Sequence, residues 1–111
     1  MRYNIPLHAA SERIANRQPF KASSVKGYTF YDGTYRVYSY STIIAEYKDG
    51  VWYVNDTHYS ITTSRAQNQV RMALHGLEYV TVIHVPYGAS TLQGRSGLVA
   101  LERANRIRVG A

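Results

Sequence analysis

A run of hydroxyl side chains that ends in an arginine, residues 59–65, is the part of the sequence best suited to hold an anion. Ser64 lies at the predicted start of a helix, where free N–H groups and the positive end of the dipole attract anions. Thr63 and Arg65 would complete a phosphate site. A second interpretation stays open, because Ser64 and Gln67 match the S-x-x-Q capping box, whose side chains satisfy helix N–H groups. The block is therefore either an anion site or a helix cap.

Tyrosines alternate with an arginine on a predicted strand, at Arg36, Tyr38 and Tyr40, with Tyr31 nearby. The chain holds 11 Tyr against 2 Phe and 1 Trp. Rings on an open sheet stack on bases while Arg holds phosphate. The alternative is that Tyr favours half-buried strands without binding anything. The face is thus a candidate for nucleic acid, although no RNP-type motif accompanies it.

Positive charge is in excess along the chain. Lys and Arg total 13 against 7 Asp and Glu, which gives a formal net charge of +6 and a pI near 9.7. The candidates for a basic patch from residue 65 onward are Arg65, Arg71, Arg95, Arg103, Arg106 and Arg108. This asymmetry suits nucleic acid or an acidic protein surface, and a solvated face that aids solubility explains it as well.

Metal and acid–base chemistry have little support in the sequence. The chain has no Cys, which excludes disulfides and thiolate metal sites. The histidines lack H-x-H and H-E-x-x-H spacing, and no G-x-S-x-G elbow is present. His58 precedes the hydroxyl block and could serve as a base, whereas His84 in an apolar strand is interpreted as structural. We expect no enzyme activity, no catalytic residue, no metal and no cofactor.

Two Asp-Gly pairs, at 32–33 and 49–50, are flanked by β-formers and predict two hairpins. A two-residue turn at 49–50 puts these residues on one face: Ile43, Ala45, Tyr47, Trp52 and Val54. The same turn at 32–33 groups Tyr28, Phe30, Tyr35 and Val37. It leaves Thr29, Tyr31, Thr34, Arg36, Tyr38 and Tyr40 on the opposite face. Residues 28–55 are predicted to form a four-stranded meander whose middle connection, near Tyr40-Ser41, is tight or bulged.

The remaining elements flank this unit. Apolar periodicity predicts a helix over 6–18, followed by a polar connector over 19–27. The capping box begins a second helix over 64–76. The β-branched run 77–85 predicts a strand. Residues 86–97 are predicted to form a loop.

The tail 98–111 fits a short helix, a strand or a mobile arm that contacts phosphates. The length of 111 residues fits one domain, 1–111. The predicted fold class is α+β: a small antiparallel β-meander of about four to five strands with about two to three packed helices.

Two sequence blocks resemble a small domain family found in tailed phages and some archaeal viruses. Its pattern is roughly YSYxTxIA, then a Trp or Tyr strand, then YSxTTS[RK]HQ opening a helix. The matching segments here are 36–45, Trp52 and 59–67, with 16–20 resembling an upstream N-R-x-P-F element. Ala66 stands where that family usually has His, so a catalytic role of that His does not transfer. The family's function is unknown, and the resemblance, over about residues 14–75, implies a viral origin and little mechanism.

These observations favour a small phage accessory protein that binds nucleic acid through a basic Tyr/Arg surface in the host cytoplasm. The predicted contact residues are Arg36, Tyr38, Tyr40, Thr63, Ser64, Arg65, Arg71 and Arg95. One alternative is a host-takeover or anti-defence protein that docks on an acidic host protein surface. Another is a sponge for a small nucleotide, held at the Ser64 helix start. No membrane association is expected, because no apolar run approaches ~20 residues, and the sequence leaves the oligomeric state open.

Overall fold

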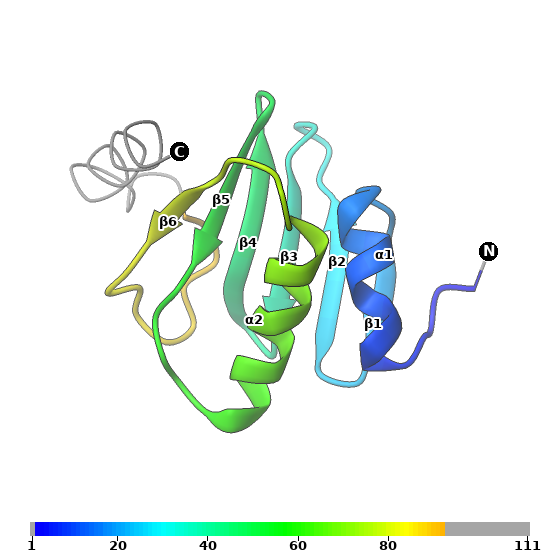
Figure 1. Cartoon of the computed structure of the whole chain (residues 1–111), viewed down its shortest axis with the longest axis horizontal. Coiled ribbons are helices and arrows are strands. Elements are labelled where there is room, and N and C mark those ends of the chain that lie inside the picture. The colour runs from blue at the N-terminus through cyan, green and yellow to red at the C-terminus, as the bar shows by residue number, and fades with distance from the viewer. Residues whose placement is uncertain (1, 93–111) are drawn as a thin grey trace.

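The protein is described by a computed structural model over residues 2–92. Its helices are η1 (Leu7–Ala9), α1 (Ala10–Ala15) and α2 (Ile61–Ala73). Its strands are β1 (Phe20–Ala22), β2 (Val25–Thr29), β3 (Tyr35–Ser39), β4 (Thr42–Lys48), β5 (Val51–Asn55) and β6 (Val80–Val82). The strands form a six-stranded sheet in chain order, antiparallel except for the parallel pair β5–β6 (Figure 1). The α+β fold class is confirmed, with a sheet larger than predicted.

Both α-helices pack on the same side of the sheet, which we call the helix face (Figure 1). The sheet contributes Phe20, Ala22, Val25, Tyr35, Val37, Ile44, Ala45, Trp52 and Val54 to this core, and the helices contribute Ala10, Ile14, Ala66, Val70 and Leu74. Burying one large apolar side chain stabilises a fold by roughly 1.5–3 kcal/mol. The helix face is therefore the main source of stability in the described chain.

The opposite side of the sheet, the open face, carries a smaller apolar cluster. Its buried members are Tyr38, Ile43, Val82, Val85, Ala89 and Leu92. The segment 83–92, which we call the strap, covers part of this face. Ile43 N–H donates to Ala89 O at 2.8 Å, and Tyr38 OH donates to Ser90 O at 2.7 Å. Neither described α-helix contributes to this cluster, so the open face over β1–β3 stays uncovered by helices.

The predicted hairpin at Asp49-Gly50 is confirmed. Asp49 and Gly50 have φ values of 53° and 79°, as a type I′ turn requires. Tyr47 pairs with Trp52, the register that a two-residue turn dictates. Ile43 departs from the prediction and lies on the open face, because a register irregularity between β3 and β4 occurs at Val37/Tyr38.

The predicted register of the first hairpin is wrong by one residue. Phe30 N–H donates to Thr34 O at 2.8 Å, so residues 31–33 form a three-residue loop with Gly33 at φ 87°. The extra loop residue pairs Tyr28 with Arg36. Because a one-residue slip moves a strand's side chains to the other face, Tyr28 and Phe30 lie on the open face instead of sharing a face with Tyr35.

The turn after β3 was predicted to be tight or bulged, and it is tight. Ser39 pairs with Thr42, so Tyr40 and Ser41 alone connect β3 to β4. Tyr40 has a φ of 55°, in the left-handed region that disfavours bulky side chains. This turn places the Tyr40 ring at the end of the open face.

Several predicted boundaries need correction. The predicted connector 19–27 contains β1 and most of β2, paired Phe20 with Gly27. Helix 6–18 is shorter than predicted and begins with the 3₁₀ turn η1. Strand 77–85 shrinks to β6, and His84 after it is exposed at φ 60° rather than buried in a strand. The predicted tail 98–111, and the end of the loop 86–97, lie outside the described residues.

Candidate functional site

The N-cap of α2 is Ser60, so the predicted cap at Ser64 is wrong. Ser60 has an extended backbone, with φ −132° and ψ 168°, and its Oγ accepts a hydrogen bond from Thr63 N–H at 3.2 Å. Ser64 already belongs to the helix, since its N–H donates to Ser60 O at 2.8 Å. The cap falls four positions earlier than predicted, and the S-x-x-Q residues lie inside the helix.

The hydroxyl block does not assemble into an anion site. Thr63 is buried, and its Oγ1 lies 3.1 Å from Ser39 Oγ on β3. Arg65, two positions further, is exposed, because residues two apart point to nearly opposite sides of a helix. The structure therefore separates Thr63 from Arg65 and commits Thr63 to packing against the sheet.

Gln67 ties α2 to the sheet. Its Nε2 donates to Asn55 O at 2.8 Å and to Thr57 O at 2.9 Å. Asn55, which the sequence reading passed over, is fully buried, and its Nδ2 donates to Ile43 O at 2.8 Å. Each buried polar group here is satisfied, which is the condition for such a network to stabilise a fold. The motif residues Ser39, Thr63 and Gln67 thus hold the structure together.

Arg36 is not free to contact phosphate, which corrects the prediction. Its Nε donates to Glu46 Oε2 at 2.6 Å, and Glu46 is fully buried. Its guanidinium also lies over the Phe30 ring, 4.4 Å from the centroid. Arg36 therefore fixes Phe30 and neutralises Glu46.

The other predicted arginines differ in their surroundings. Arg71 forms an ion pair with Asp56 and donates to Asn68 Oδ1 at 3.0 Å, so its charge is already matched. Arg65 borders a shallow groove of about 480 Å³ between η1 and α2. Arg95, like Arg103, Arg106 and Arg108, lies outside the described residues.

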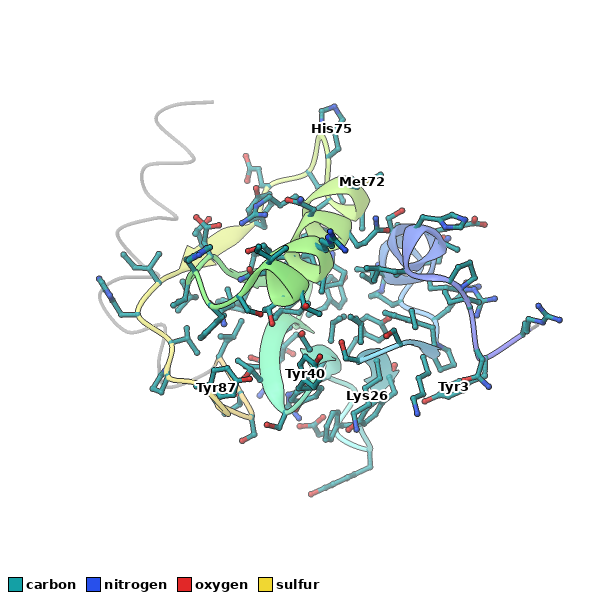
Figure 2. All side chains as sticks on the ribbon, turned by 90° about the horizontal axis from the view of Figure 1, so that it is seen from below. Tyr3, Lys26, Tyr40, Met72, His75 and Tyr87 are labelled. Carbon is teal, nitrogen blue, oxygen red and sulfur yellow. The ribbon has the colours of Figure 1, made fainter. Side chains whose placement is uncertain are left out.

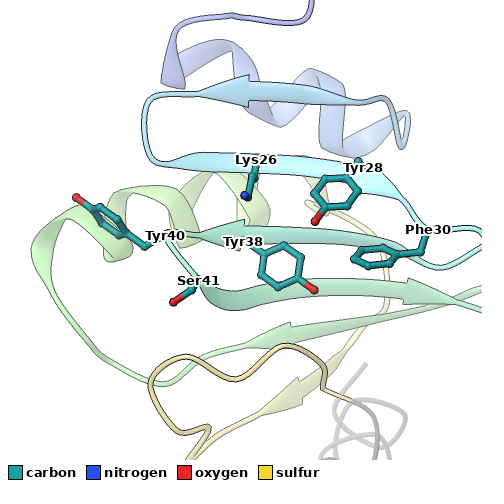
Figure 3. A pocket seen from close by; sticks show the side chains of 6 residues that line it. All are labelled: Lys26, Tyr28, Phe30, Tyr38, Tyr40 and Ser41. Carbon is teal, nitrogen blue, oxygen red and sulfur yellow. The ribbon is translucent and has the colours of Figure 1, made fainter.

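The open face carries a hollow of about 330 Å³ above β2 and β3 (Figure 3). It is lined by Lys26, Tyr28, Phe30, Tyr38, Tyr40 and Ser41. We call these residues together with Lys21 the platform. The Tyr28 and Phe30 rings are stacked at a centroid distance of 4.9 Å, and Tyr38 is 6.2 Å from Tyr28. Of the predicted pair, Tyr38 is buried at the base of the hollow, and Tyr40 is 54% exposed.

Lys21 and Lys26 supply the positive charge of the platform, and both were missed at the sequence level. They are cross-strand partners on β1 and β2, and both are exposed. Each alternates with residues buried on the helix face, such as Phe20 and Val25. The signal was the period-two alternation within 19–27, hidden by the polar composition of that segment.

The two sides of the molecule are separated by the sheet. Lys26 and Tyr40 lie on the side opposite Met72 and His75, which belong to α2 and the turn after it (Figure 2). Arg65, which is exposed on α2 and lines a groove with Leu7, His8 and Met72, therefore lies apart from the platform.

Charge is unevenly distributed along the platform. Asp32 follows Phe30, and Thr34 N–H donates to its Oδ1 at 2.9 Å, which lowers the pKa of the Asp32 carboxyl. Asp32 therefore stays ionised at neutral pH at the Phe30 end. Lys26 and Ser41 lie toward the Tyr40 end (Figure 3). Burial raises the pKa of the Tyr38 phenol, so its hydroxyl stays a donor to the strap.

The family model that matches the chain covers residues 10–76 and describes a family of unknown function, DUF8033. The chain belongs to this family. The matched span includes the Asn55–Gln67 network and the platform, whereas the strap follows it. No curated protein and no solved structure matches the chain.

Two further properties hold for residues 2–92. No helix there is long and apolar enough to cross a bilayer. No cluster of three or more His, Asp or Glu there could hold a metal ion.

Proposed function

We propose that this protein binds single-stranded nucleic acid on the platform. The observation that carries the proposal is the coincidence of accessible rings and lysines on one sheet face that neither α-helix covers. Aromatic rings accept any base by stacking, which contributes roughly 1–3 kcal/mol per base, and nearby cations hold the backbone. The original Tyr/Arg hypothesis is kept in a changed form, with Lys21 and Lys26 in place of Arg36, Arg65 and Arg71.

Single strands fit the platform better than duplexes. The rings lie on a sheet surface and the Tyr38 ring is at its base, so a ligand must bring a flat face down to the sheet. Duplex bases are stacked on one another and present only their edges, whereas unpaired bases can turn onto aromatic side chains. The proposal covers DNA and RNA alike. It includes the viral role that the phage resemblance suggests, an accessory protein acting in the host cytoplasm.

Fluorescence anisotropy with labelled oligo-dT and oligo-U, between about 50 and 200 mM salt, tests the proposal. Affinity should fall with salt, with a log–log slope of about −0.7 per phosphate contact. A duplex of equal length should bind more weakly. Binding that is absent, or independent of salt, would contradict the proposal.

A matched pair of variants tests on which side of the sheet the nucleic acid binds. Tyr40→Asn removes an exposed ring and keeps a residue that tolerates the left-handed backbone. Met72→Ala removes a side chain of similar exposure, 60% against 54%, from the opposite side of the sheet. Only Tyr40→Asn should weaken binding. Light scattering of both variants checks the alternative that the platform joins two copies of the chain.

The groove between η1 and α2 supports a second candidate, docking on an acidic protein surface. Its lining contains the cation Arg65, the imidazole of His8 and the exposed apolar side chain of Met72, and no carboxylate. A host protein that binds in the presence of nuclease, is lost with Arg65→Glu and is retained with Lys26→Gln would assign the groove to a protein partner. Equal loss of host-protein binding in both variants would argue against the groove as the protein-binding site.

A further inference from the structure

We infer that the platform, if it binds a single strand as proposed above, does so in one orientation and with a short footprint. One end of the strand places its phosphate over Lys21 and Lys26, next to the β3–β4 turn. The bases stack on the Tyr28 and Tyr40 rings above the buried Tyr38, and the strand runs from that end along β3. The inference rests on the proposed function and adds the register of the ligand on the sheet.

The two ends of the platform differ in charge. Lys21 and Lys26 lie side by side across β1 and β2, and the Ser41 hydroxyl lines the same hollow as Lys26. The Phe30 end carries the Asp32 carboxylate, which lies 4.0 Å from Arg36 and shares that single positive charge with the buried Glu46, so negative charge is in excess there. A phosphate is attracted to the first end and repelled from the second. This asymmetry orients the backbone.

Contacts within the protein hold the platform rings in place before a ligand binds. Arg36 is held by Glu46 at 2.6 Å and in turn covers one side of Phe30. Tyr38 is held by its hydrogen bond to Ser90 O at 2.7 Å. Rings fixed before binding cost little entropy when a base arrives. Tyr40, which is exposed at the turn, lines the same hollow and offers its ring to the ligand.

The strap bounds the hollow on the β4 side. The strap crosses the open face beside Tyr38 and is anchored to β4 by Gly88 N–H, which donates to Thr42 Oγ1 at 2.8 Å. A strand of nucleic acid therefore cannot continue across β4 and β5. It can only follow β3, whose five residues extend about 17 Å. Sheet platforms of this kind stack about two or three bases.

A length series tests the footprint. We would measure the affinity of 5′-phosphorylated thymidine oligonucleotides of about one to ten nucleotides for the full-length protein. Affinity should rise steeply up to about three or four nucleotides and only slightly beyond. A steep rise that continues past about eight nucleotides would overturn the inference and leave the proposed function standing. No binding at any length would overturn both.

Charge variants test the orientation. Lys26→Gln should reduce the salt slope by about 0.7, the value of one phosphate contact to a single strand. Arg65→Gln removes the same charge from the helix side and should leave the slope unchanged. Tyr40→Asn should weaken binding roughly 5- to 150-fold at an unchanged slope, because it removes stacking alone.

Asp32→Asn distinguishes the two ends of the platform. If the phosphates avoid the Phe30 end, the neutral variant should change affinity by less than about twofold, because no phosphate then lies within a screening length of Asp32. A large gain in affinity, together with no effect of Lys26→Gln on the slope, would place the phosphates at the wrong end and overturn the inference.

Discussion

The helix face and the open face of this sheet use polar side chains in opposite ways. On the helix face, Thr63 and Gln67 are buried, and their hydrogen bonds to Ser39 Oγ and to the Asn55 carbonyl join α2 to the strands. On the open face, Lys26 and Tyr40 reach solvent beside an aromatic hollow. The hydroxyl-rich block 59–65, at the start of α2, belongs to the first group. A distinctive motif can therefore mark residues that build a fold, whereas the proposed binding surface combines Tyr38, Tyr40 and Ser41 of the other block with lysines from a segment without a motif.

The largest expected effect on stability comes from Glu46, under the strap on the open face. Glu46→Ala leaves Arg36 with only the more distant Asp32, 4.0 Å away, and removes the acceptor of Leu92 N–H, 3.1 Å away. Breaking such a buried pair should cost about 3–5 kcal/mol in urea unfolding. The double variant Arg36→Met, Glu46→Leu should cost less than Glu46→Ala alone, because no unpaired charge remains. If the loss of unfolding free energy in the double variant equalled the sum of the losses in the two single variants, the two residues would not be energetically coupled.

High pH should destabilise both faces. Burial raises the pKa of Tyr35 on the helix face and of Tyr38 on the open face above the ordinary value of 10.0. The unfolded chain loses these protons first as pH rises above about 10, so each phenol should cost up to about 1.4 kcal/mol of stability per pH unit. Below pH 10 the two phenols contribute no pH dependence. Absorbance at the tyrosinate band during alkaline unfolding should show a late step that Tyr35→Phe removes. A titration of all tyrosines near pH 10 without unfolding would contradict this.

Gln67→Leu tests the network of the helix face. It removes the donor to Asn55 O and Thr57 O, and an unsatisfied buried polar group costs roughly 1–3 kcal/mol. Gln69→Leu is the control, since Gln69 is half-buried and accepts one bond, from Ser11 N–H at 3.1 Å. Thermal unfolding should show a clearly larger loss for Gln67→Leu. Equal losses would mean that the network contributes no more than an ordinary surface contact. Nucleic-acid affinity should be unchanged in both variants that remain folded.

The smallest effect separates the two serines of the motif. Ser60→Ala removes the N-cap and should cost about 1 kcal/mol, whereas Ser64→Ala should change stability by less than about 0.5 kcal/mol. Chemical denaturation of the two variants under identical conditions measures the difference. A greater loss of stability for Ser64→Ala than for Ser60→Ala would support the capping box predicted at Ser64.

Local patterns predicted the fold well where the turn chemistry was unambiguous. Asp49-Gly50 adopted the expected turn, and Trp52 and Val54 joined the core as the register required. Asp32-Gly33 accepted one more loop residue, and that single residue turned Tyr28 and Phe30 to the other face. Sequence cannot decide between these loop lengths, because both use Asp-Gly, and the choice depends on which rings the helices bury.

The candidate site was predicted only in part for the same reason. Tyr40 was expected to be accessible and is, since it occupies a tight turn. Arg36 looked free until its cross-strand partner, the buried Glu46, was in place. Lys21 and Lys26 were hidden in a segment whose polar composition resembled a connector. Pairing between strands, which single-sequence reasoning does not supply, determined each of these outcomes.

The most direct test of the central claim is an amide chemical-shift titration of the labelled protein with a short oligo-dT. If the platform binds single-stranded nucleic acid, the shifted resonances should cluster at Lys21, Lys26, Tyr28, Tyr38 and Tyr40. Amides on the exposed side of α2, such as Arg65 and Met72, should stay in place. Shifts that cluster along the η1–α2 groove, or no shifts at saturating oligonucleotide, would contradict the assignment of function to the open face.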